Sequence, residues 1–195
     1  MGLLSKIRFF PWLPGAPFSG TILSGIILTG AILSLSVAVP TPARAGAVLV
    51  TIAVEGQAAP DANGTIGSIS DVSLNDAGQV VFNSSLMQGT AGGAADNSGI
   101  FRGTGGSLTQ IAREGNAAPG GGGGAFGSFN NIKMNSSGQV AFTSSSMTGT
   151  SGGTANDRGV FSGDGGAITE IAREGDTAPD ANGTLSNFGN VGIRD

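Results

Sequence analysis

Residues 75–82 read Asn-Asp-Ala-Gly-Gln-Val-Val-Phe, and residues 135–142 read Asn-Ser-Ser-Gly-Gln-Val-Ala-Phe. In each stretch an Asn is followed three residues later by a Gly, and then by an apolar segment that contains a Phe. Asn bonds to its own backbone in tight turns, and Gly adopts the positive φ that many turns need. We therefore predict a tight hairpin turn with a positive-φ glycine at Gly78 and at Gly138, each followed by a strand.

These stretches belong to a tandem repeat with a period of about 60 residues. Residues 99–101 (Gly-Ile-Phe) return as Gly-Val-Phe at 159–161, and residues 52–56 (Ile-Ala-Val-Glu-Gly) return as Ile-Ala-Arg-Glu-Gly at 111–115 and 171–175. Self-similarity at such a period is typical of repeat proteins, in which each unit packs against its neighbours. We divide the chain into a leader (1–45), repeat 1 (46–115), repeat 2 (116–175) and the start of a third repeat (176–195).

Each repeat is predicted to be a small antiparallel sheet. Apolar segments bounded by turn formers indicate four strands in repeat 1, at residues 68–74, 79–86, 99–102 and 107–114. The predicted fold class is all-β: tandem four-stranded antiparallel meanders of about 60 residues, similar to propeller blades. Because Val81 points to the opposite face from Val80 and Phe82, both faces of the sheet should be covered. A β-sandwich or an open stack of sheets would satisfy the same pattern.

The packing of successive repeats is predicted from the aromatic residues. We expect the recurring phenylalanines to form the core between successive sheets, rather than an exposed ladder of contacts; they are Phe82, Phe101, Phe142 and Phe161. The third repeat stops early, because Asp195 stands where the Asn of the turn motif belongs. The array is therefore incomplete as given, and we expect either a longer parent protein or self-association through open sheet edges.

The turn motif resembles that of a known family, the choice-of-anchor tandem repeat NxxGxxAF-containing proteins. The second copy matches the pattern in full, with Asn135, Gly138, Ala141 and Phe142. The first copy matches with Asn75, Gly78 and Phe82, while Val81 replaces the alanine. The resemblance implies a bacterial exported protein, often tethered by a C-terminal sorting signal, with no assigned molecular function.

The first 45 residues are typical of a secretory signal. Lys6 and Arg8 precede an uncharged apolar run at residues 21–39, which we predict to be a signal helix. Small residues then lead to a predicted cleavage site between Ala45 and Gly46. An uncleaved membrane anchor is the alternative. With cleavage, the protein would be secreted, periplasmic or attached to the cell surface.

Charge and composition exclude several classes of function. Loss of Lys6, Arg8 and Arg44 with the leader leaves six of the nine basic residues against thirteen acidic ones, a net charge of −7. Such an acidic surface argues against binding of nucleic acid or anionic lipid, so membrane contact is expected only through the signal segment or a missing C-terminal anchor. The chain has no Cys and no His, which removes disulfides, the usual zinc ligands and the commonest general base.

Two loops rich in Asp and Asn are the only candidate metal site. Asp61-Ala62-Asn63-Gly64 recurs as Asp180-Ala181-Asn182-Gly183. Their oxygen atoms suit calcium, so we name Asp61, Asn63, Asp180 and Asn182 as candidate ligands. The alternative is ordinary turn formation, because the third acidic position and the closing Glu of an EF-hand are absent. No other cofactor is predicted.

Two further features are interpreted as structural. Arg113-Glu114 and Arg173-Glu174 are expected to be solvated strand ends, and the glycine run at 120–124 is expected to be a flexible linker. No catalytic constellation emerges, and we predict a non-enzymatic exported scaffold that binds an unknown macromolecule. The alternative is an extracellular enzyme that uses carboxylates or calcium at the repeat axis.

Overall fold

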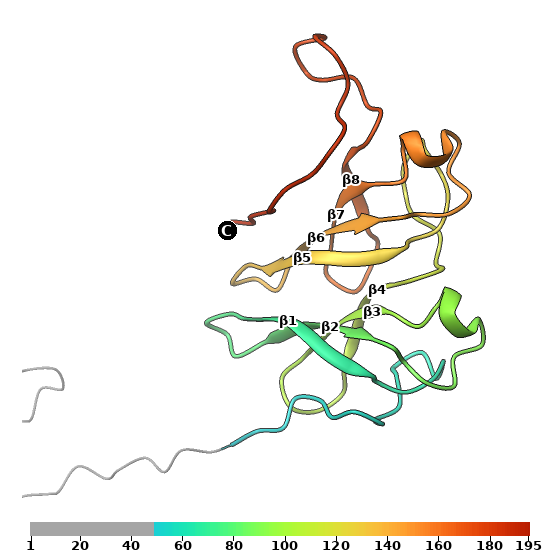
Figure 1. Cartoon of the computed structure of the whole chain (residues 1–195). Helices are drawn as coiled ribbons and strands as arrows, with labels where there is room; N and C mark the ends of the chain where they lie inside the picture. The colour runs from blue at the N-terminus through green and yellow to red at the C-terminus, as the bar shows by residue number, and fades with distance from the viewer. Residues whose placement is uncertain (1–48) are drawn as a thin grey trace, which may run out of the picture. The chain divides into compact units, whose positions relative to one another are not determined.

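The computed structural model describes residues 49–195, which belong to one compact unit and form two four-stranded antiparallel sheets (Figure 1). The first sheet consists of β1 (Ser68–Leu74), β2 (Val80–Ser85), β3 (Gly99–Gly103) and β4 (Thr109–Arg113). The second consists of β5 (Ser128–Met134), β6 (Val140–Ser145), β7 (Gly159–Gly163) and β8 (Thr169–Arg173). In both sheets the strands lie in chain order, which confirms the predicted all-β meanders. The predicted signal helix and the Ala45–Gly46 cleavage site lie outside the described residues.

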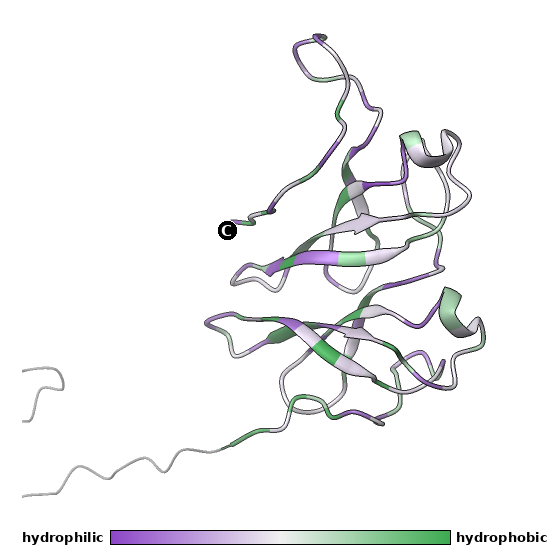
Figure 2. Cartoon of the chain, viewed as in Figure 1, coloured by the Kyte–Doolittle hydropathy of each residue, from purple (hydrophilic) through white to green (hydrophobic). Residues whose placement is uncertain are grey.

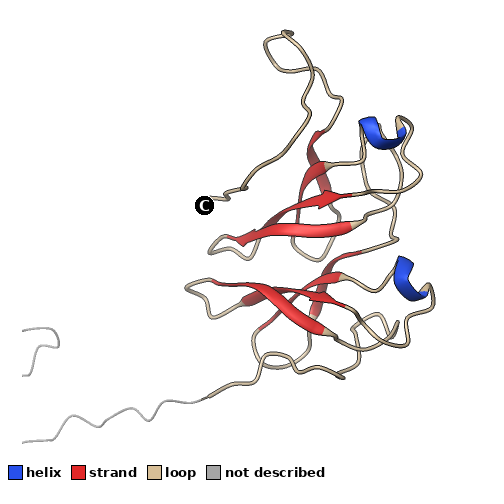
Figure 3. Cartoon of the chain, viewed as in Figure 1, coloured by secondary structure: helices blue, strands red, loops and turns tan. Residues whose placement is uncertain are grey.

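The second sheet repeats the first, strand for strand, 60 residues later. Both sheets have a bulge in their first strand, between Ser70 and Ser73 and between Asn130 and Lys133. A short 3-10 turn follows the second strand of each sheet, as η1 (Gly93–Ala95) and η2 (Gly153–Ala155) (Figure 3). Within the described part of the chain, no helix has the length and apolar character needed to cross a membrane.

The two NxxG turns have the predicted geometry. The Asn75 side-chain oxygen accepts the backbone N–H of Gln79 at 2.9 Å, and the Asn75 carbonyl accepts the N–H of Gly78 at 3.0 Å. Asn135 makes the same two bonds at 2.8 and 3.1 Å. Gly78 and Gly138 have φ values of +75° and +88°, so the prediction of positive-φ turn glycines is confirmed.

The two sheets pack face to face through an apolar core. Val81 and Ile100 of the first sheet are fully buried in one cluster with Phe142 and Phe161 of the second. The strands of both sheets carry apolar residues, as does the segment that leads into the first sheet (green in Figure 2). The other residues of this inter-sheet core are Ile111, Ala112, Ala118, Phe126, Phe129, Ile132, Val140 and Met147. The predicted inter-sheet position of Phe142 and Phe161 is therefore confirmed.

The first sheet buries its own Phe pair differently. Phe82 and Phe101 lie 5.9 Å apart and are buried, as predicted, but they pack against the segment that precedes β1. Ile52, Ala59 and Ile66 supply that contact, in place of a sheet. Burial of Phe82 on one face and Val81 on the other confirms that the sheet is covered on both sides at β2.

Equivalent turns of the two repeats are joined by hydrogen bonds. The Asn75 amide nitrogen donates to the Asn135 carbonyl at 3.0 Å, and Arg102 donates to the Gly138 carbonyl. The Asn135 amide nitrogen in turn donates to the Arg194 carbonyl at 3.2 Å. The motif asparagine thus closes its own turn with its oxygen and binds the next repeat with its nitrogen. An Asp carboxylate could perform only the first role, because it has no donor when ionised.

Candidate functional site

The two repeated arginines are buried, so their interpretation as solvated strand ends is wrong. The side chains of Arg113 and Arg173 are each only 1% exposed. Arg113 donates to the carbonyls of Asn63 and Asp96 at 2.8 and 2.7 Å. Arg173 donates to the corresponding carbonyls, those of Gly123 and Asn156, at 3.2 and 3.4 Å. Each arginine therefore holds the loop before the first strand of its sheet against the long loop after the second, which is a structural role.

The charge partners of these arginines differ between the repeats. Arg173 forms a close ion pair with Glu170, with 2.6 Å between Nε and Oε2, and its guanidinium lies 5.6 Å from the Phe161 ring centroid. Arg113 has only a distant carboxylate, Asp61, at 3.7 Å. A buried guanidinium needs such partners, because an unpaired buried charge is costly. Sequence spacing did not reveal this, since the partners come from loops whose paths the repeat period does not define.

The glycine run at 120–124 is a loop held by specific packing and hydrogen bonds, so its interpretation as a flexible linker is wrong. A Cβ atom on Gly122 would lie 2.9 Å from Arg173 Cδ, and one on Gly120 would lie 2.2 Å from Glu170 Oε1. The carbonyls of Pro119 and Gly123 accept hydrogen bonds from Arg173. Glycine is therefore needed here because the buried ion pair lies directly against the backbone.

The candidate calcium ligands of the first loop are engaged in loop contacts. The Asp61 carboxylate accepts the backbone N–H of Asn63 at 3.0 Å. The Asn63 side chain donates to Asp96 at 2.8 Å and accepts the N–H of Ala91 at 2.7 Å. Asp180 accepts the N–H of Asn182 in the same way, in an exposed loop. These bonds support the turn alternative at both loops, and calcium binding stays a prediction.

Two acidic groups near Arg113 have shifted pKa values. Hydrogen bonds from the side chains of Thr90 and Asn63 lower the pKa of Asp96 below its usual value. Desolvation raises the pKa of Glu114. Among residues 49–195, no three His, Cys, Asp or Glu side chains gather in a way that could hold a metal ion. The shifted pKa values of Asp96 and Glu114 thus accompany the loop contacts around Arg113.

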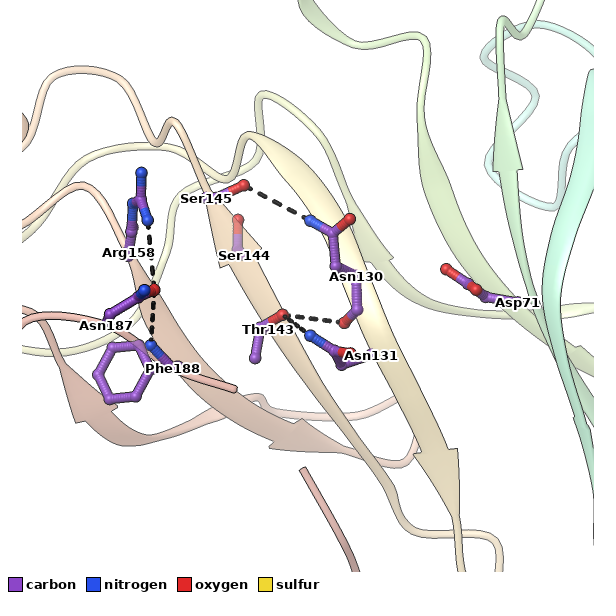
Figure 4. A pocket seen from close by; sticks show the side chains of 9 residues that line it. All are labelled: Asp71, Asn130, Asn131, Thr143, Ser144, Ser145, Arg158, Asn187 and Phe188. Carbon is purple, nitrogen blue, oxygen red and sulfur yellow. Dashed lines mark hydrogen bonds between the residues drawn. The ribbon is translucent and has the colours of Figure 1, made fainter. Parts of the chain in front are cut away.

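A polar pocket of about 350 Å³ lies at β5 and β6 (Figure 4). Three parts of the chain contribute to it: the β1 bulge of the first sheet, strands β5 and β6 with the loop that follows them, and the segment after β8. All but one of its side chains are polar. The lining residues are Asp71, Asn130, Asn131, Thr143, Ser144, Ser145, Arg158, Asn187 and Phe188.

The bulges in the first strands position part of this lining. Asp71 and Asn131 occupy equivalent bulge positions and have φ values of +48° and +53°. Asp and Asn tolerate this left-handed conformation better than other side chains that carry a Cβ atom. Bulges also redirect side chains relative to a regular strand. The same local irregularity therefore places an Asp from one sheet and an Asn from the other at a single pocket.

Hydrogen bonds hold the remaining polar groups in place. Thr143 donates to the Asn130 carbonyl at 3.1 Å and accepts from the Asn131 amide at 3.4 Å. The Asn187 side-chain oxygen accepts from Arg158 at 3.3 Å and from the Phe188 backbone N–H at 3.0 Å. Figure 4 shows the Arg158–Asn187 pair on the side of the pocket opposite Asp71.

None of the predicted site residues lines this pocket. The signal that could have revealed it is the run of polar residues in β6, Thr143-Ser144-Ser145, which lies beside Asn130 and Asn131 of β5. The corresponding positions of the first sheet are also polar: Ser70, Asp71, Asn83, Ser84 and Ser85. The apolar positions of these strands predict a core, whereas the polar positions at the strand ends do not by themselves predict a site.

Comparison with known proteins identifies a family but no better characterised relative. A model described as "Family of unknown function (DUF7453)" matches residues 26–194. No curated protein and no solved structure matches the chain.

Proposed function

The chain belongs to the DUF7453 family, whose function is unknown, and we propose that it is a non-enzymatic exported repeat protein that serves as a binding scaffold. The observation that carries this proposal is the stacking of two matching sheets. They share the apolar core between them, and hydrogen bonds join their equivalent turns. Stacked repeats create broad surfaces that suit the binding of a macromolecule.

The nature of the contacts supports a scaffold role. The motif Asn holds the stack, because its side-chain nitrogen bonds to the turn of the next repeat. The buried Arg holds two loops together within its own repeat. The polar pocket is assembled from separate repeats, so it depends on the stack being intact. Binding would therefore be a property of the assembled array, while each sheet alone supplies only part of a site.

Export is proposed from the leader and from the family resemblance of the NxxGxxAF motif. We expect the mature protein to begin at Gly46 and to reach the periplasm or the cell surface, where its partner is a macromolecule. Contact with the membrane is expected only through the signal segment or a C-terminal anchor. The acidic net charge is consistent with this assignment, because it argues against binding of nucleic acid.

A labelling experiment tests both export and the stack. The chain has no cysteine, so a single Cys can be introduced at the exposed turn residue Ala77 or, as a matched control, at the fully buried Val81. A maleimide that cannot cross the cytoplasmic membrane should label Ala77→Cys in intact cells and leave Val81→Cys unlabelled. Labelling of Ala77→Cys only after lysis would contradict export. Equal labelling of both positions would contradict a folded stack in the cell.

A further inference from the structure

We propose that the pocket at β5 and β6 binds a neutral carbohydrate chain. This inference deepens the proposed scaffold function and rests on it, because it names the chemical class of the partner. It is carried by the lining chemistry, by the balance of charge, by the position of Phe188 and by a difference between the two repeats.

The lining chemistry matches that of a hydroxyl-rich ligand. Three side-chain amides and three hydroxyls line the pocket, and each of these groups can both donate and accept a hydrogen bond. A sugar hydroxyl has the same dual character. Asn130 is exposed and Asn131 half-buried, while Thr143 and Ser144 are buried behind them. The amides of Asn130 and Asn131 therefore lie at the surface of the pocket, and the hydroxyls of Thr143 and Ser144 lie at its base.

The charge of the pocket favours a neutral ligand. Asp71 supplies one negative charge and Arg158 one positive charge, and no other ionisable side chain lines the pocket. The Arg158 Nε atom also lies 3.8 Å from the Asp157 carboxylate, which balances its charge from outside the pocket lining. The Arg158 side chain is 49% exposed, so its guanidinium still has donors for a ligand beside its bond to Asn187. A carboxylate and a guanidinium each bind pairs of hydroxyls well, whereas Asp71 would repel an anionic polymer and Arg158 a cationic one.

Phe188 supplies an apolar surface at the pocket. Its ring is partly buried and is the one aromatic group among the lining residues. The apolar face of a sugar ring can lie against such a ring while the hydroxyls around its edge bond to the amides. Figure 4 shows the Phe188 ring beside Asn187, on the same side of the pocket as Arg158.

The two repeats differ at the residues that would contact a ligand. Ser144 is needed for structure, because its hydroxyl accepts the N–H of Gly127, as Ser84 accepts that of Gly67. Asn130 and Arg158 have no such role that both repeats share. Their counterparts 60 residues earlier are both serine, Ser70 and Ser98. The second repeat thus carries larger amide and guanidinium groups on the same serine-rich frame, while Phe188 comes from the third repeat, where it corresponds to Phe129.

The test is a titration of the purified chain with defined saccharides, followed by calorimetry. The probes are cellohexaose, chitohexaose and dextran as neutral chains, alginate as an anionic chain, and glycerol as a small polyol. We expect saturable binding of at least one neutral chain, tighter for the hexamer than for its monomer, and none of alginate or glycerol. No binding of any neutral chain, or preferred binding of alginate, would overturn the proposal, and so would glycerol binding as tight as that of the hexamer.

Variants locate the binding. Asn130→Ala and Phe188→Ala remove groups that are at least partly exposed, so both variants should melt at the same temperature as the parent. Each should weaken binding about tenfold, the effect of losing roughly one hydrogen bond or one ring contact. Ser70→Ala, the counterpart of Asn130 in the first sheet, is the control and should bind as the parent does. Unchanged binding by both pocket variants would refute this site, and the labelling experiment in cells would still report separately on export and the stack.

Discussion

The first strands of the two sheets occupy the same place in the repeat but have different surroundings. In β1, Ile69, Val72 and Leu74 are 37%, 61% and 67% exposed. In β5, the equivalent Phe129 and Ile132 are 3% and 2% exposed, and Met134 is partly buried. The difference arises because β5 packs against the first sheet. The equivalent face of β1 instead borders an open apolar groove that is lined by Ile69 and Val72. Burial in this fold is therefore decided by the neighbouring sheet rather than by the position within the repeat.

The largest expected effect comes from placing a charge at Ile132 in β5 and, for comparison, at the equivalent Val72 in β1. Ile132→Asp would bury a carboxylate without a partner, and we expect a loss of about 4 kcal/mol or more in the free energy of unfolding. Val72→Asp changes an exposed residue and should alter stability by less than about 0.5 kcal/mol. Urea denaturation of both variants provides the comparison. Similar losses at the two positions would show that β1 is covered in solution.

The recurring Phe positions of the second strands should give a smaller contrast. Phe142→Ala should cost about 3–5 kcal/mol, because Phe142 is fully buried between the sheets. Phe82→Ala should cost at least about 1 kcal/mol less, since Phe82 also lines the open groove and water can enter the space that it leaves. Denaturant melts measure both values. A loss below about 1 kcal/mol for Phe142→Ala would contradict the inter-sheet core.

The turn glycines test the contact between repeats. Alanine at either position must adopt a left-handed conformation, which costs about 1–2 kcal/mol. A Cβ atom on Gly78 would meet nothing within 4 Å, whereas one on Gly138 would lie 2.6 Å from both Arg102 Nη1 and Gln79 Oε1. Arg102 and Gln79 must move aside, and because these atoms end flexible side chains the extra cost is small, so Gly138→Ala should be the more destabilising by less than about 1 kcal/mol, measured by thermal melting. A lower melting temperature for Gly78→Ala than for Gly138→Ala would contradict the contact between the turns of the two repeats.

The smallest effect concerns pH and the long loops. The pKa of Asp96 is lowered in the folded state, so its contribution to stability is complete above the ordinary Asp value of about 3.9 and is lost as the pH falls through the lower folded-state pKa. The equivalent residue of the second repeat is Asn156. Its side-chain oxygen accepts the N–H of Gly152, as Asp96 accepts that of Gly92. The stability advantage of the parent over Asp96→Asn should therefore shrink between about pH 5 and pH 3.

Denaturation of the two proteins across this range checks the prediction. Glu114, whose pKa is raised, contributes with the opposite sign, because its burial opposes folding above its ordinary pKa. Desolvation is the main cause of the Glu114 shift and is present in both proteins, but Asp96→Asn also removes the nearby charge that raises the Glu114 pKa further, so only part of the Glu114 effect cancels in the difference. A difference that is constant with pH would show that the Asp96 carboxylate makes no special contacts in the folded state.

Much of the fold was predictable because local chemistry decides it. The bounds of β1 follow from the apolar pattern of residues 68–74, and the two turns follow from the Asn and Gly at their ends. The arginines were misjudged for a physical reason. A charged residue at a strand end is usually solvated, and only the fold of two distant loops surrounds Arg113 and Arg173 with carbonyl groups.

The sequence shows the polar run of β6, Thr143-Ser144-Ser145, but not the other residues that complete the polar pocket. Its residues come from positions as far apart as Asp71 and Phe188, and the repeat period alone does not say that the β1 bulge and the segment after β8 meet β5. Ser144 and Asn130 look like ordinary polar residues of a strand. They form a candidate site only because two sheets and a following segment converge there.

The sequence by itself determined the repeat, the four strands of each sheet and their turns, because these depend on contacts between residues close in the chain. Tertiary structure alone decided which of two equivalent residues is buried. Ile132 and Val72 share one position of the repeat, but only Ile132 has a sheet against it. The physical reason is that removal of apolar surface from water depends on what covers the residue, and the covering face belongs to another repeat.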